Sequence, residues 1–155
     1  EKLKSSVAPI YVNFESADEL LQAVVEKTFA ISRGILAEQS SGHLFQDIGL
    51  VSLRFAKEYP VLFRDLALIQ NEYMQDNSED MNHILVQEMK DDPELKGFSE
   101  KELLNILLKM KVFQTGLSFM VCSELLTEEK AIELLSDTSL DVIWSARNRK
   151  EEKRF

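Results

Sequence analysis

Hydrophobic residues recur at spacings of three and four along most of the chain, which is the period of an amphipathic helix. Glycine and proline, the residues that interrupt helices, occur only five and three times in 155 residues. Strand-like alternation of apolar and polar residues is absent from the sequence. The pattern therefore predicts an all-α protein.

Local signals predict where the first four helices begin and end. The first, over residues 16–39, opens with the capping box Ser16-Ala-Asp-Glu19. The next two are expected over residues 44–59 and 60–73, the second with a proline in its first turn. A fourth is expected from Asn77 or Ser78 until an Asp-Asp-Pro sequence stops it at residues 91–93.

The last two expected helices are apolar on more than one side. Ser99-Glu-Lys-Glu102 is a second capping box, the run over residues 103–121 is apolar almost all round, and Thr127 opens the partner helix. One apolar face of these two helices can pack on the rest of this chain, and the other face is most simply buried against an identical copy. We therefore predict an isologous homodimer through a four-helix bundle. The alternative is that a single chain buries both faces. The residues expected at the dimer interface are Leu107, Leu117, Met120, Val121, Leu135, Ile143 and Trp144.

Composition narrows the classes of function. The formal net charge of −9 argues against a surface that coats nucleic acid, because neutralising phosphates needs clustered Lys and Arg. No apolar stretch is long enough to cross a membrane, so no membrane partner is expected. The single cysteine, Cys122, cannot form an internal disulfide, which fits a reducing cytoplasm. We expect a cytoplasmic protein.

The residue types that carry catalysis do not gather in the sequence. His43 follows a Ser-Ser-Gly break without a partner at metal-ligand spacing, and His83 stands alone on a polar face. Acidic pairs at 79–80 and 91–92 are explained by helix caps and solvated helix ends. We therefore expect no enzyme activity, no catalytic or metal-binding residue and no cofactor.

Three motifs in order along the chain carry a resemblance to a known family. Residues 6–14 read Ser-Val-Ala-Pro-Ile-Tyr-Val-Asn-Phe and are followed by Ser16 and Leu20-Leu21. Residues 55–63 read Phe-Ala-Lys-Glu-Tyr-Pro-Val-Leu-Phe, and residues 114–117 read Gln-Thr-Gly-Leu. This ordered set resembles the tetracycline repressor family of transcriptional regulators, whose recognition helix ends in an aliphatic-Tyr-x-His-Phe pattern. The resemblance implies a helical bundle whose last two helices form a dimeric four-helix bundle.

The resemblance also implies a division of the chain. Residues 1–16 would be the C-terminal remnant of a helix-turn-helix head, and residues 17–155 the effector-binding and dimerisation domain. The implied DNA-binding residues are Ser6 at the start of the recognition helix, Val7, Ala8 and Pro9 near base edges, and Tyr11 and Asn13 near phosphates.

The head departs from the family pattern and is incomplete. Asn13 stands where the family has His, Ala17 where it has a basic residue, and Lys4-Ser5 where it has Gly-Val. The absence of a basic side chain at position 17 predicts a weaker contact with DNA phosphates. The earlier helices of a head are missing and the chain starts at Glu1, so we expect further residues upstream and operator binding only by the full-length protein.

In the resembled family, a small effector binds inside the effector-binding domain and pivots its first large helix. This movement changes the separation of the dimer's two recognition helices, which must match one DNA turn of about 34–36 Å. The cavity residues implied here are Phe29, Phe55, Met74, Leu85, Met110, Phe113 and Gln114. This mostly apolar set suits a lipophilic or aromatic effector, although for any single one of these residues ordinary core packing is the better explanation. The expected function is a ligand-responsive DNA-binding regulator, most simply a repressor. The alternative is a helical protein–protein interaction module that does not bind DNA and is monomeric.

Overall fold

The computed structural model describes residues 12–38, 41, 44–65 and 78–152, and every regular element within them is a helix. The elements are α2 (Ala17–Glu38), α3 (Leu44–Glu58), the short α4 (Pro60–Phe63), α6 (Ser78–Met89), the 3-10 turn η2 (Pro93–Leu95), α7 (Glu100–Cys122) and α8 (Glu128–Glu152). The all-α prediction is confirmed for these residues. The expected third helix begins at Pro60 as predicted, and its continuation through residues 66–73 lies outside the described residues.

Both predicted capping boxes form contacts at helix starts, in different ways. At α7, the Ser99 hydroxyl accepts from the Glu102 backbone N–H (3.4 Å), and the Glu102 carboxylate accepts from the Ser99 backbone N–H (2.7 Å). At α2, Ser16 Oγ accepts from the Glu19 N–H (3.1 Å), but the Glu19 carboxylate reaches one residue farther, to the Glu15 N–H (2.5 Å). In each case, side chains satisfy backbone donors that a helix start leaves unpaired.

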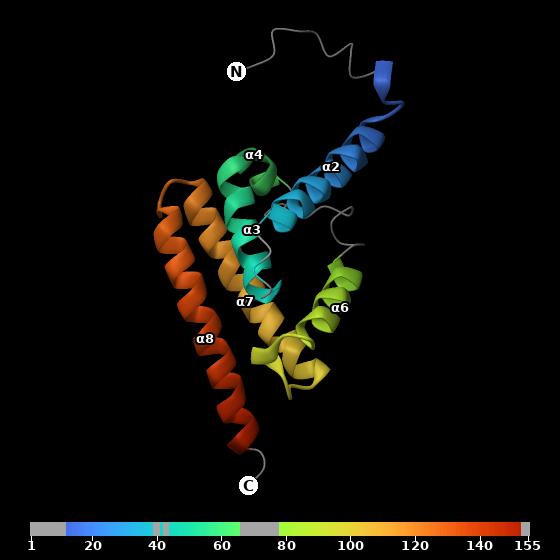
Figure 1. Ribbon diagram of the computed structural model, residues 1–155. Coiled ribbons are helices and arrows are strands. Elements are labelled where there is room, and N and C mark those ends of the chain that lie inside the picture. The colour runs from blue at the N-terminus through green and yellow to red at the C-terminus, as the bar shows by residue number, and fades with distance from the viewer. Residues whose placement is uncertain (1–11, 39–40, 42–43, 66–77, 153–155) are drawn as a thin grey trace.

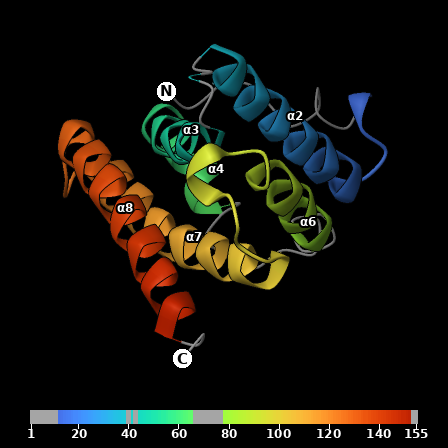
Figure 2. The same cartoon turned by 60° about the horizontal axis from the view of Figure 1, so that its bottom comes forward.

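The α7–α8 hairpin is the frame on which the other helices pack (Figures 1 and 2). Helix α3 lies against both hairpin helices, α6 packs on α7, and α2 packs on the far side of α3. Three apolar clusters fill these contacts: one joins α6, η2, α7 and α8, one joins α3, α7 and α8, and one joins α2, α3 and α4. In Figure 1 the N-terminal end of α2 points away from the hairpin.

Burial corrects the expected dimer-interface residues. Five of the seven are buried in the chain's own core: Leu107, Leu117, Val121, Leu135 and Ile143. They face α3, α6 or each other across the hairpin, so their side chains are not available to a second copy. Met120 and Trp144 are exposed.

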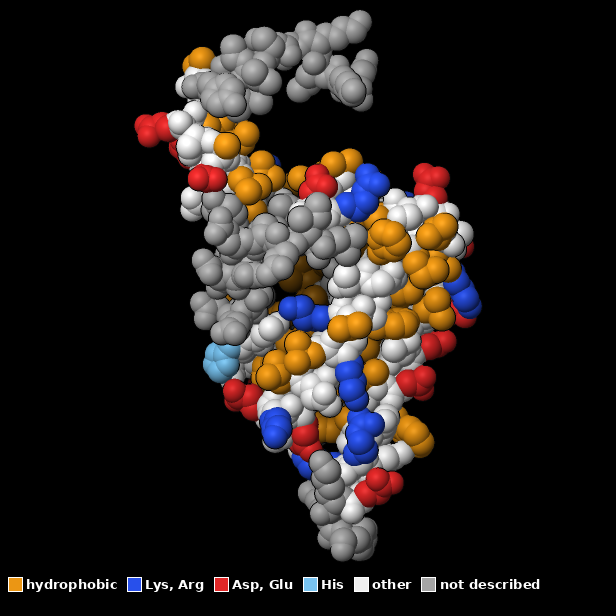
Figure 3. All heavy atoms as spheres, turned by 180° about the vertical axis from the view of Figure 1, so that it is seen from behind, with side chains coloured by type: hydrophobic (Ala, Val, Ile, Leu, Met, Phe, Trp, Pro, Cys, Tyr) orange, Lys and Arg blue, Asp and Glu red, His pale blue; other side chains and the backbone are white. Residues whose placement is uncertain are grey.

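A second apolar face of the hairpin is not covered by described residues. The exposed apolar side chains of the hairpin outside the cavity described below are Leu104, Leu108, Val112, Phe119 and Met120 of α7 with Leu140 and Trp144 of α8, and they are together called the exposed hairpin face. Much of the surface that α7 and α8 present in Figure 3 is hydrophobic. One wide face of α7 is therefore buried within the chain, as the compact alternative required, while another remains apolar and exposed.

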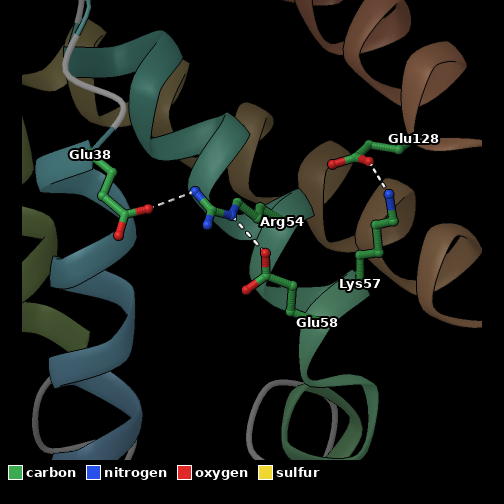
Figure 4. Close-up of polar contacts among 5 residues, drawn as sticks. All are labelled: Glu38, Arg54, Lys57, Glu58 and Glu128. Carbon is green, nitrogen blue, oxygen red and sulfur yellow. Dashed lines mark hydrogen bonds and ion pairs between the residues drawn. The ribbon is translucent and has the colours of Figure 1, made fainter.

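Ion pairs connect α3 to the helices on either side of it (Figure 4). Arg54 contacts Glu38 at the end of α2 (3.0 Å) and Glu58 one turn along α3 (2.7 Å), and these hydrogen bonds raise the pKa of Arg54. Lys57 pairs with Glu128 in the first turn of α8. Pairs this exposed contribute little to stability because water screens them, so their main effect is to orient the helix ends.

Candidate ligand cavity

A cavity of about 730 Å³ lies between α2, α3, α6, α7 and α8. This volume falls within the range of small-molecule sites, roughly 300–1,000 Å³. Its apolar lining includes Phe29, Leu36, Ile48, Leu85, Met89, Met110 and Ile132. Figure 3 shows a hollow with hydrophobic side chains inside it and a basic side chain at its edge.

Short side chains explain why the helices leave this space unfilled. Gly49 brings α3 so close to α8 that a Cβ built on it would lie 2.7 Å from Cδ2 of Leu135. Beside that contact the cavity is bordered by Ser52 of α3 and by Ser136 and Ser139 of α8. Since protein interiors otherwise pack without voids, a row of small residues next to a fixed helix crossing produces a cavity.

Polar groups from three helices reach the same space. Lys111 of α7 lines the cavity and its Nζ donates to Oδ1 of Asn82 on α6 (2.8 Å). Burial lowers the pKa of Lys111, although part of the side chain reaches solvent. Gln114, one turn farther along α7, also lines the cavity, as do Arg33 of α2 and Glu88 of α6.

The structure brings together four of the seven residues expected around a cavity: Phe29, Leu85, Met110 and Gln114. Two others lie elsewhere. Phe55 is core, stacked on Tyr59 with 5.3 Å between ring centroids, and Phe113 packs against the α3–α7–α8 cluster. Met74 lies outside the described residues.

Sequence reasoning missed the charged residues of the cavity. It looked for apolar side chains, whereas Lys111 follows buried Leu107 by four residues and precedes Gln114 by three. A lysine on the inward face of a helix, flanked by apolar residues of the same face, was the available signal.

The residues with an implied role in DNA binding are almost all outside the described part of the chain. Ser6, Val7, Ala8, Pro9 and Tyr11 fall there, while Asn13 is described and exposed. The described residues contain no group of three or more His, Cys, Asp or Glu that could hold a metal ion. None of the described helices is both long enough and apolar enough to cross a membrane.

Comparison of the chain with protein-family models, with curated proteins and with solved structures finds no match in any of the three. The function proposed below is supported by the residues of this chain alone.

Proposed function

We propose that the chain is the ligand-sensing and dimerising body of a DNA-binding transcriptional regulator, acting as a repressor. The observation that carries the proposal is the position of α2. This helix follows the segment that resembles a recognition helix, and it supplies one wall of the cavity through Phe29, Ser32, Arg33 and Leu36. If α2 can adopt two orientations, a ligand that binds one of them more tightly favours that orientation. The DNA-reading segment attached to α2 then changes its orientation as well.

The lining of the cavity supports a lipophilic or aromatic effector. Binding can be tested with the neutral fluorescent probe N-phenylnaphthylamine. Gln114→Phe should fill the cavity and weaken binding of the probe, whereas Thr115→Phe, at the next position on α7 but exposed, should leave binding unchanged. If both variants bind the probe equally well, the cavity is not the site at which the probe binds.

The exposed hairpin face supports dimerisation through a second copy. Over its whole length α7 carries three lysines and two acids, both acids in the first turn, whereas α8 from Glu128 to Asp141 carries five acids and one lysine. In a four-helix bundle whose two-fold axis is perpendicular to the helices, α7 runs parallel to the partner's α8, because the rotation reverses the direction of every helix. Lys109 of α7, which does not line the cavity, then faces the acidic half of the partner's helix around an apolar centre.

Light scattering across a dilution series tests this arrangement. Val112, which belongs to the exposed hairpin face, is 76% exposed, and Val61 on α4, which does not belong to it, is 58% exposed. We expect a persistent dimer that Val112→Glu converts to monomer and that Val61→Glu leaves intact. A wild-type chain that is monomeric throughout would favour the interaction-module reading, in which this face binds a different protein.

DNA binding is tested on the full-length protein by selection from random duplex DNA. Enriched sequences should be palindromic, with half-sites separated by about one helical turn, roughly 34–36 Å. A lipophilic ligand that occupies the cavity should release them. Failure to enrich any sequence, with the dimer intact, would contradict the repressor proposal.

A further inference from the structure

The most informative group in the cavity is the ammonium of Lys111. It lies on α7 beside Leu107, Met110 and Gln114, all of which line the same space, and its side chain is also exposed to solvent. Its one hydrogen bond among the described residues is to the neutral amide of Asn82, and no carboxylate there lies within ion-pair distance. A partly desolvated cation with only a neutral partner is left undercompensated.

The rest of the polar lining has the same sign. Arg33 reaches the cavity from α2, and Glu88 from α6 is its single acidic residue among those described. Neither Arg33 nor Glu88 forms an ion pair within the described residues. Two cations and one carboxylate leave a net positive lining around a mostly apolar space.

We propose that the cavity binds an acidic amphiphile, a molecule with a lipophilic body and a carboxylate headgroup that ion-pairs with Lys111. This inference rests on the proposed function, since it specifies the chemical class of the effector. The apolar walls accept the body, while the ammonium and the adjacent Gln114 amide meet the headgroup. An alcohol headgroup leaves the Lys111 charge uncompensated, and a cationic headgroup is repelled by two of the three charged side chains.

Three ligands with the same alkyl chain test the charge preference: dodecanoate, dodecanol and dodecylamine. Each displaces N-phenylnaphthylamine from the wild-type protein in a titration kept below the concentration at which the ligand aggregates. We expect dodecanoate to bind at least about tenfold more tightly than dodecanol, the value of one charge-assisted contact, and dodecylamine to bind most weakly. Equal affinity for acid and alcohol, or tighter binding of the amine, would overturn the inference.

Variants at two neighbouring lysines assign the preference to one side chain. Lys111→Met should abolish the preference for dodecanoate while retaining affinity for dodecanol, and Lys111→Arg should restore the preference. Lys109→Met is the matched control, because Lys109 lies on the same helix but does not line the cavity. A preference that survives Lys111→Met refutes the assignment. If wild type binds dodecanol without preferring the acid, the cavity proposal stands and the charge inference fails; if it binds none of the three, both fail.

Discussion

Replacing Glu102 by Gln removes the charge from the contact that fixes the start of α7 to the end of α8. The carboxylate accepts from the backbone N–H and the hydroxyl of Ser99 (2.7 and 2.8 Å) and pairs with Lys150 of α8 (3.2 Å). The backbone hydrogen bond from Ser99, its hydroxyl and then Lys150 together hold the pKa of Glu102 at about 2, below its ordinary 4.5.

The size of the effect follows from this pKa and from the exposure of the two side chains. Taken alone, the fall in pKa corresponds to about 3 kcal/mol of folding free energy. The Glu102 side chain is 35% exposed and that of Lys150 28%, so water screens the contacts. We therefore expect Glu102→Gln to cost about 1 kcal/mol, the usual value of a helix cap.

The pH dependence separates this cause from a general packing defect. Because folding lowers the pKa of Glu102, its contribution is fully present above about pH 5 and is lost as the pH falls through about 2. Urea denaturation of wild type and Glu102→Gln, at one protein concentration, should give a free-energy difference that is constant from about pH 7 to pH 5 and shrinks toward pH 2. Glu100→Gln, in the same helical turn but without the capping contacts, should cost less at pH 7. A Glu102→Gln difference that does not change with pH would refute the reasoning.

Two further pairs of variants are compared, the first by urea denaturation and the second by amide hydrogen exchange. Gly34→Ala should stabilise the protein by about 0.5–1 kcal/mol, because the added Cβ meets nothing within 4 Å and alanine favours a helix. Gly49→Ala should lack this gain because its Cβ lies 2.7 Å from Leu135, and equal effects of the two would contradict the close α3–α8 contact. Arg54→Met should speed hydrogen exchange at the C-terminal end of α2, whereas Lys57→Met, whose ion pair joins α3 to α8, should not.

Helix boundaries were predictable because the signals that set them are local. Ser99 and Glu102 lie three residues apart and form their contacts whatever surrounds them, so the start of α7 could be predicted from sequence. Helix α2 likewise begins at Ala17, directly after the predicted cap residue Ser16. A capping residue bonds backbone groups of its own helical turn. The position of a capped helix start therefore depends little on tertiary structure and can be predicted from sequence.

The orientation of α7 and α8 about their own axes was not predictable. Leu107 and Val112 are both apolar residues of α7, yet one is buried against the core and the other is 76% exposed. A helix that is apolar on most sides gives no periodic signal to choose between its faces. The docking of α3, through Leu53 and the close approach at Gly49, decides which face is buried.

The cavity was predictable in residue type and only partly in position. Phe29 and Phe55 are equivalent in a sequence pattern, but the first lines the cavity while the second stacks in the core. What separates them is where small residues of α3 and α8 leave space, which depends on the crossing of helices distant in sequence. The role of Lys111 was not predictable because an exposed lysine on a helix is usually a solvated surface residue, and only the neighbouring helices show that it lines a cavity.

The geometry of α2 gives the proposed regulation a mechanical basis. At about 1.5 Å per residue, the 22 residues of α2 form a lever of roughly 33 Å. Its C-terminal end is held to α3 by Glu38 and Arg54, and its middle lines the cavity through Phe29 and Arg33. A ligand that bridges Arg33 and Lys111 therefore acts about 8 Å from the fixed end of the helix. Under the proposed function, a rotation of about 5° moves the other end by roughly 3 Å, enough to disturb a half-site separation set by the pitch of DNA.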